Sequence, residues 1–187
     1  MEKVNEINMT DKRNVFSAEK NNRARAAALL TGYLTMDPYK DVNWGILCIG
    51  TDRITGDCLG PLVGSRLKSQ GIKLPVYGTL EHPLHADNLP SLLPALKKRY
   101  PSHHFLAVDA ALGPRQHLGE VLIKPSPLQP GKGLKKSLPC VGDISITGII
   151  GEEDSIPELI LPYTRLYLVD KLAEFISRCI TESISAI

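Results

Sequence analysis

The sequence predicts a single-domain α/β protein in which helices cover both faces of a mostly parallel central sheet, a three-layer αβα arrangement. Its 187 residues are a length typical of one domain. Hydrophobic residues make up 43% and charged residues 22% of the chain, which excludes a disordered or collagen-like protein. Short apolar runs alternate with segments of helical periodicity, and alternating strands and helices build parallel sheets.

The chain is expected to divide at about residue 43. Residues 1–43 are rich in Asn, Lys, Glu and Arg and are predicted to form an N-terminal arm, partly mobile, that packs on the main domain over residues 44–187. One short helix is predicted in the arm, over Arg23–Leu34, because its apolar residues fall on one helical face.

Two strand-loop-helix units open the main domain. The run Trp44–Gly50 is short, apolar and continuous, as in a strand buried on both faces, and a helix is predicted over Pro61–Gln70 after a glycine-rich loop. A second unit is predicted from the strand Leu74–Thr79 to the helix Leu89–Tyr100, where Pro90 suits the first helical turn.

The second half of the domain departs from this alternation. Phe105–Ala110 is predicted to be a third buried strand, while Glu120–Lys124 and Asp143–Ile150 are expected to add mixed or antiparallel strands. The last helix is expected to begin after Thr164 as its N-cap, and its apolar stripe predicts that it covers the sheet.

Composition also excludes several classes of protein. A formal charge of +2 lacks the basic bias of a nucleic-acid binder, and no apolar run is long enough to span a bilayer or to serve as a signal peptide. We therefore expect a cytoplasmic protein with no membrane partner and no direct nucleic-acid binding. No cofactor is expected, because the glycines at 50, 56 and 60 do not have the spacing of a dinucleotide fingerprint.

Two aspartates are candidates for catalysis. Asp57 lies in the loop after the strand Trp44–Gly50, and Asp109 ends a run of four apolar residues where a buried strand emerges into a loop. Both positions are where the reactive crevice of an open α/β sheet lies. Asp57 could instead cap a helix, although Pro61 favours Gly60 for that position, and Asp109 could form an Asx-turn. If the two carboxyl groups lie close together, repulsion between their charges disfavours ionisation of both at once. One then stays protonated while the other activates water. Asp52 is an alternative to Asp57.

Three further residues are candidates for binding or supporting roles. His85 and Asn88 lie in the loop before the second helix, where Asn88 also suits an N-cap and a loop histidine also suits a structural hydrogen bond. Asp143 follows a glycine and also suits an ordinary turn. A thiol hydrolase with Cys58 as nucleophile and His85 as base is an open alternative without an evident third group.

Five blocks of sequence, in order, carry a resemblance to a known family. They are Ile49–Pro61, Gly78–Leu80 with His85–Leu89, Ala107–Gly113, Val141–Gly148 and Thr164–Val169. Together they resemble the YyaC family of sporulation proteins, which is similar to the germination protease of spore-forming bacteria and, more distantly, to the hydrogenase maturation endopeptidases. By this resemblance Asp57 and Asp109 fall on the two catalytic aspartates of the germination protease.

The resemblance implies a phosphorylase/hydrolase-like fold and an aspartic-type endopeptidase that cleaves small acid-soluble spore proteins in the forespore or spore core. A homo-oligomer stays open. One alternative is a non-catalytic spore protein that keeps the fold and binds peptide. Another is a metal-dependent endopeptidase in which Asp57 and Asp109 would be joined by a third ligand, for which His85 is the candidate. We expect no metal requirement, because a shared-proton pair already supplies a base and an acid.

Overall fold

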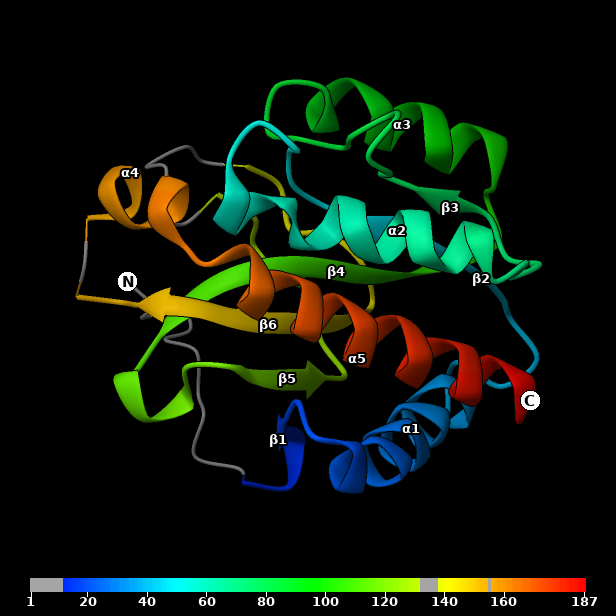
Figure 1. Ribbon diagram of the computed structural model, residues 1–187. Helices are drawn as coiled ribbons and strands as arrows, with labels where there is room; N and C mark the ends of the chain where they lie inside the picture. The colour runs from blue at the N-terminus through cyan, green and yellow to red at the C-terminus, as the bar shows by residue number, and fades with distance from the viewer. Residues whose placement is uncertain (1–11, 132–137, 155) are drawn as a thin grey trace, which may run out of the picture.

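The computed structural model describes residues 12–131, 138–154 and 156–187. One six-stranded sheet runs through the molecule in the order β1-β5-β6-β4-β2-β3 (Figure 1). The strands are β1 (Val15–Ser17), β2 (Asn43–Cys48), β3 (Val76–Tyr77), β4 (His103–Gly113), β5 (Glu120–Lys124) and β6 (Ile144–Glu152). Neighbours among β6, β4, β2 and β3 are parallel, whereas β5 pairs antiparallel with both β6 and β1.

Helices cover both faces of this sheet, which confirms the predicted three-layer α/β fold. The helices are α1 (Lys20–Thr35), α2 (Leu59–Ser69), α3 (Leu89–Arg99), α4 (Pro157–Ile160) and α5 (Leu166–Ser185). Single turns of 3₁₀ helix are η1 (Lys12–Asn14), η2 (Thr55–Cys58), η3 (Arg115–His117) and η5 (Leu161–Tyr163). Among the described residues no helix has the length and apolar content needed to cross a membrane.

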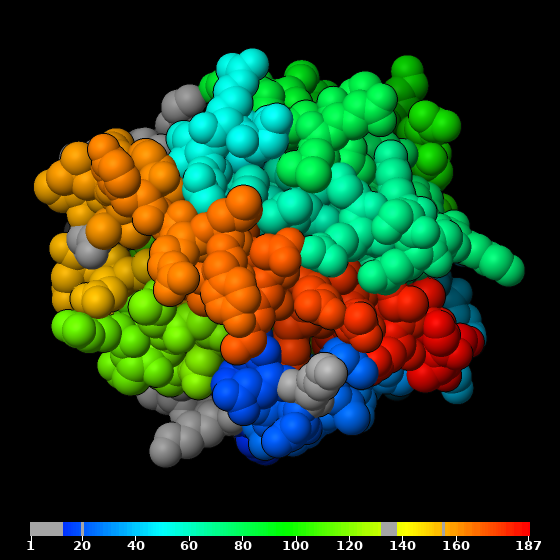
Figure 2. Space-filling view, viewed as in Figure 1, coloured from blue at the N-terminus to red at the C-terminus, as the bar shows by residue number. Residues whose placement is uncertain are grey.

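Successive side chains of the central strands enter two separate cores, as the twofold alternation of a strand requires. Ile46 packs in the core beneath α1, α2 and α5, and its neighbour Leu47 packs in the core beneath α3. Figure 2 shows α5 running across the molecule with α2 on one side and α1 on the other. The strands are therefore buried on both faces, which explains their continuous apolar sequence.

The predicted N-terminal arm is part of the same structural unit. Its helix extends over Lys20–Thr35, and Val15–Ser17 form the edge strand β1, which the sequence did not predict. Phe16 and Leu30 are buried in the core that α5 covers. Residues 1–11 of this arm, which was expected to be partly mobile, lie outside the described residues.

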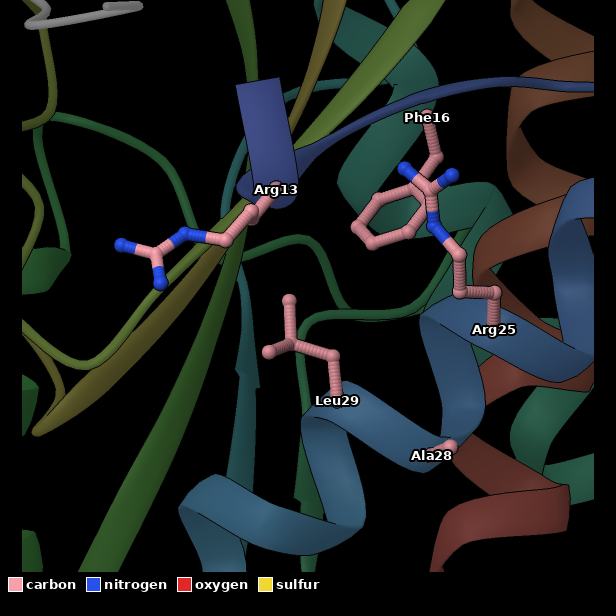
Figure 3. A pocket seen from close by; sticks show the side chains of 5 residues that line it. All are labelled: Arg13, Phe16, Arg25, Ala28 and Leu29. Carbon is pink, nitrogen blue, oxygen red and sulfur yellow. The ribbon is translucent and has the colours of Figure 1, made fainter. Parts of the chain in front are cut away.

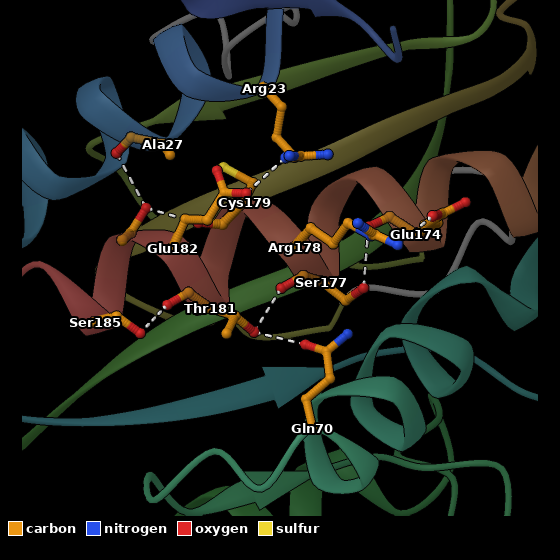
Figure 4. A network of polar contacts seen from close by, with 11 residues as sticks. Arg23, Ala27, Gln70, Glu174, Ser177, Arg178, Cys179, Thr181, Glu182 and Ser185 are labelled. Carbon is orange, nitrogen blue, oxygen red and sulfur yellow. Dashed lines mark hydrogen bonds and ion pairs between the residues drawn. The ribbon is translucent and has the colours of Figure 1, made fainter. Parts of the chain in front are cut away.

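Polar contacts join α5 to both of its neighbouring helices (Figure 4). Arg23 of α1 forms an ion pair with Glu182 at 2.7 Å, and the Ser183 hydroxyl donates to the carbonyl oxygen of Ala27 at 3.0 Å. On the other side the Thr181 hydroxyl donates to Oε1 of Gln70, just after α2, at 2.6 Å. These contacts fix the helical layer that packs on one face of the sheet.

The start of α5 differs from its prediction. Thr164 does not cap this helix, because Arg165 occupies the N-cap position and α5 begins at Leu166. The Thr164 hydroxyl instead donates to the carbonyl oxygen of Ile160 at 3.0 Å and closes the preceding turn. The short helices α4 and η5, which the sequence did not predict, occupy that preceding segment.

Candidate active site

The structure brings Asp57 and Asp109 to the same edge of the sheet. Val108 of β4 pairs with Cys48, the last residue of β2, so Asp109 lies just beyond the point where β2 ends. Asp57 lies in η2, which follows β2 directly (Figure 1). Asp57 thus follows β2, and Asp109 lies in the carboxyl half of β4 beside the end of β2, near the end of the strands where open α/β sheets place their sites.

The turn that carries Asp57 depends on a close backbone approach at Gly50. Gly50 has φ +137°, and a Cβ at this position would lie 2.0 Å from the carbonyl oxygen of Asp57. The Thr51 N–H donates to that same carbonyl oxygen at 3.0 Å. Because α2 begins at Leu59 with Cys58 in the N-cap position, neither Asp57 nor Gly60 is the cap residue that the sequence suggested.

The two carboxyl groups differ in burial and influence each other. Asp109 is only 8% exposed, and its Oδ1 accepts a hydrogen bond from the Ala110 N–H at 2.8 Å. Burial raises the pKa of Asp109 well above its usual value, and the charge of Asp57 raises it further. Burial also raises the pKa of Asp57, to about 6, against the opposing effect of the Thr51 N–H.

The charge of Asp57 thus disfavours ionisation of Asp109. Two interacting acids lose their protons in separate steps that belong to the pair as a unit. Between those steps one carboxylate can accept a proton while the other carboxyl group can donate one. The arrangement can thus supply a general base and a general acid at one place.

Thr147 joins this edge, although the sequence analysis did not single it out. It pairs in register with Asp109 on the neighbouring strand β6, and residues paired in this way point to the same face of the sheet. Thr147 lies within the block Val141–Gly148, but only the strand register places it beside an aspartate. A hydroxyl there can both accept and donate a hydrogen bond.

His85 and Asn88 lie in a loop that is attached to the same edge. The Gly50 N–H donates to the carbonyl oxygen of Leu84 at 2.8 Å, which ties this loop to the end of β2. Asn88 does not cap α3 with its side chain. Its Oδ1 accepts from the His85 N–H and its Nδ2 donates to the Pro83 carbonyl oxygen, both at 2.9 Å.

His85 makes its own contacts within this loop. Its Nδ1 accepts a hydrogen bond from the Asp87 N–H at 3.3 Å and lies 3.8 Å from the Asp87 carboxylate. The structure thus brings His85 to the correct edge of the sheet, but the contacts that orient the ring come from its own loop.

Asp143 immediately precedes β6, at the opposite end of the parallel strands from Asp57 and Asp109. Its Oδ2 accepts a hydrogen bond from the Phe105 N–H at 2.8 Å, and its Oδ1 lies 3.0 Å from Nδ1 of His104. Both partners are near the amino end of β4, whereas Asp109 lies toward its carboxyl end. The structure therefore does not bring Asp143 together with Asp57 and Asp109, and its contacts are those of a residue that joins β4 to β6.

The geometry also bears on two alternatives, a cysteine nucleophile at Cys58 and a metal site at the aspartate pair. Burial and the charge of Asp57 raise the pKa of the Cys58 thiol, which leaves it protonated and a poor nucleophile. Within the described part of the chain, no group of three or more His, Cys, Asp or Glu side chains is placed to hold a metal ion. The aspartate pair thus lacks the third donor that borderline transition metals favour.

A surface hollow of about 590 Å³ lies elsewhere (Figure 3). It is lined by Arg13, Phe16, Arg25, Ala28 and Leu29. The Arg25 guanidinium lies over the Phe16 ring at 4.9 Å, an arrangement typical of a cation–π contact. None of its lining residues belongs to the carboxyl edge of the parallel strands, so we do not assign the chemistry to this hollow.

Comparison with known proteins is consistent with the resemblance found in the sequence. A family profile described as "Protein of unknown function (DUF1256)" matches residues 14–179. "Uncharacterized protein YyaC" of Bacillus subtilis (strain 168) is 42% identical over 133 residues, which are 71% of this chain and 65% of that protein. The match thus spans slightly less than two thirds of the relative, and it confirms the predicted resemblance to YyaC.

One solved structure is also similar. The crystal structure of a [NiFe] hydrogenase maturation protease HycI from Thermococcus kodakarensis KOD1 superposes with a TM-score of 0.45 and 20% sequence identity. The superposition covers 82% of this chain and 99% of that chain.

Proposed function

The chain belongs to the family described as "Protein of unknown function (DUF1256)", and we propose that this member is an aspartic-type endopeptidase. The observation that supports the proposal is a pair of carboxyl groups, Asp57 and Asp109, at the carboxyl edge of the sheet with both pKa values raised. Such a pair holds one proton over a range of pH in which ordinary carboxyl groups hold none.

The burial of the two residues suggests their roles. Asp109 is the more deeply buried of the two and keeps the proton, so it is the general acid, while the ionised Asp57 is the general base. The oxygen of a water molecule attacks the scissile carbonyl carbon while Asp57 takes a proton from that water. At the same time Asp109 protonates the carbonyl oxygen. Asp57 then passes its proton to the amide nitrogen, the C–N bond breaks, and Asp109 regains a proton from the intermediate's hydroxyl group.

The substrate and the setting of the reaction follow from the YyaC resemblance. We propose small acid-soluble spore proteins as substrates and the cytoplasm of the forespore, or the spore core, as the location.

The test is cleavage of a purified small acid-soluble spore protein by the purified full chain. Asp57→Asn and Asp109→Asn should each abolish cleavage, because each removes one member of the acid–base pair. Asp52→Asn is the matched control, since Asp52 is an exposed acid of the same loop and should retain full activity. Cleavage that persists in both site variants, with contaminating proteases removed, contradicts the proposal.

The rival function is that of a non-catalytic spore protein that binds peptide at this edge. It requires no shared proton. A ¹³C NMR titration of the Asp57 and Asp109 carboxyl carbons separates the two functions, because a working pair gives at least one strongly raised pKa. Two ordinary carboxyl titrations in the folded protein would favour the rival.

A metal-dependent endopeptidase would need a third ligand beside the two aspartates. His85 is the candidate that the sequence offers, but the hydrogen bond and the acid closest to its ring nitrogen come from Asp87 in its own loop. The donor set around the pair therefore does not fit a borderline transition metal such as zinc or nickel, and the proposed mechanism uses no metal.

A further inference from the structure

Of the nine large apolar side chains that are exposed among the described residues, five lie in one segment of the chain, residues 156–167. We call this group the apolar shelf, and its members are Ile156, Leu159, Tyr163, Leu166 and Tyr167. Tyr163 is 83% exposed and Tyr167 is 69% exposed. Single exposed apolar residues are normal on soluble proteins, but several gathered together mark a site of interaction.

The apolar shelf borders the candidate active site. Leu161 of η5 lies within the same segment and packs on Gly56. The contact is close: a Cβ at Gly56 would lie 2.9 Å from Cδ2 of Leu161. Gly56 immediately precedes Asp57 in η2. Figure 2 shows the orange residues of this segment against the cyan residues of the turn after β2.

Contacts within the segment hold the apolar shelf in place. The Leu159 N–H donates to the Ile156 carbonyl oxygen at 3.0 Å, and the Leu168 N–H donates to the Arg165 carbonyl oxygen at 2.9 Å. The Arg165 guanidinium also lies 5.9 Å from the centre of the Tyr167 ring. These contacts fix the backbone that carries the apolar side chains, so the backbone need not be ordered when a partner binds.

The size and place of the apolar shelf indicate what it binds. A stable interface between two folded proteins takes roughly 20–30 residues on each side. The shelf offers five large apolar side chains, which suits a short stretch of polypeptide better than a second copy of this chain. Because Leu161 of this segment packs on Gly56, a polypeptide bound on the shelf would lie beside the turn that carries Asp57.

We propose that the apolar shelf binds large apolar side chains of an extended polypeptide substrate, beside the bond that Asp57 and Asp109 cleave. The inference rests on the proposed function and names the chemistry of its substrate. Tyrosine suits this role, because it offers a large apolar surface with few rotatable bonds and is enriched among the residues that dominate binding energy.

Binding is measured apart from cleavage, in the full chain carrying Asp57→Asn. The probe is a fluorescent, unstructured peptide with a block of Leu and Phe residues, compared by anisotropy with a peptide in which Ser replaces that block. The double variant Tyr163→Ser, Tyr167→Ser should bind the apolar peptide at least about tenfold more weakly. Both side chains are exposed, so the fold should tolerate the change.

The matched control is Met36→Ser with Ile187→Ser, two exposed apolar residues outside the shelf, and it should bind the peptide like the parent. Unchanged binding by the tyrosine double variant, equal binding of the apolar and Ser-substituted peptides, or an equal loss in the control would overturn the inference. So would a chain that sediments as a dimer, becomes monomeric on the tyrosine substitutions and binds no peptide.

The two proposals can fail separately. Shelf-dependent binding without cleavage by the unmodified chain would support the apolar shelf and contradict the endopeptidase. Cleavage of apolar substrates with an unchanged KM in the tyrosine double variant would support the endopeptidase and overturn the apolar shelf.

Discussion

Asp57 and Asp109 share an edge of the sheet but differ in their access to water, and this difference separates their acidities. Burial raises the pKa values of both carboxyl groups, and the charge of Asp57 raises that of Asp109 further. The sequence predicted both residues because each comes after an apolar run, in the loop beyond Trp44–Gly50 for Asp57 and at the end of Phe105–Val108 for Asp109. It could not assign the acid and the base, because burial depends on which loops close over the edge.

Activity should depend on pH through this pair. The base must be ionised, and the pKa of Asp57 is raised to about 6. We therefore expect kcat/KM to fall tenfold for each pH unit below about 6 and to stay high at neutral pH while Asp109 keeps its proton. The measurement is kcat/KM against pH with a fluorogenic peptide. Full activity retained at pH 4 would contradict the assignment.

Because its carboxyl group is buried, Asp109 should lower the stability of the folded chain at neutral pH. Its raised pKa means that the folded chain keeps a proton that the unfolded chain releases, so folding free energy is lost as pH rises above the ordinary carboxyl range. Asp109→Asn should therefore raise the free energy of unfolding at pH 7. At pH 3, where both states are protonated, the gain should disappear. Urea unfolding at the two pH values measures this, and an equal effect at both would contradict it.

Thr147 should act on Asp109 through its hydroxyl group, because the two residues pair in register on β6 and β4. We expect Thr147→Val, which keeps the shape of the side chain, to lower kcat about tenfold with little change in KM. Thr147→Ser keeps the hydroxyl and should retain most of the activity. If both variants lower kcat equally, the effect comes from strand geometry and the prediction is wrong.

At the scale of elements, the sequence predicted strands and helices well where they are long and buried. Trp44–Gly50 and Phe105–Ala110 are apolar because helices cover both faces of β2 and β4, and a continuous apolar run is a strong signal. The edge strand β1 has three residues, too few for a period to be recognised. Its pairing with β5, more than a hundred residues away, is not encoded locally.

The turn between β2 and α2 should tolerate no side chain at Gly50. Alanine there would meet the Asp57 carbonyl oxygen at 2.0 Å with φ at +137°. Gly50→Ala should therefore cost roughly 2–4 kcal/mol of stability and displace Asp57, with loss of activity. Gly71→Ala is the matched control, because Gly71 also has positive φ (+73°) but no atom stands within 4 Å of its Cβ position.

The control variant should cost only about 1 kcal/mol and leave activity intact. Chemical unfolding and peptide cleavage measure the two effects. Equal losses in Gly50→Ala and Gly71→Ala would mean that backbone strain alone, rather than the approach to Asp57, governs this turn.

At the scale of the molecule, the topology decides which loops meet. The order β6-β4-β2 places Asp109 of β4 between Thr147 of β6 and the end of β2, and the loops of Asp57 and His85 adjoin that end of β2. The parallel direction of β6 sends Asp143, which precedes it, to the other edge. A sequence shows that Asp143 adjoins a strand, but the sheet order and direction are set by contacts between distant segments.

The same topology leads to a prediction about metal. Borderline transition metals such as zinc bind strongly where imidazole or thiolate joins carboxylates, and two carboxylates alone bind them weakly. The ring of His85 is oriented by contacts within its own loop. We therefore expect cleavage to be unchanged after dialysis against a chelator, and His85→Ala to reduce kcat far less than Asp57→Asn does. Activity that disappears with the chelator and returns with one added divalent ion would contradict the shared-proton mechanism and make His85 a ligand.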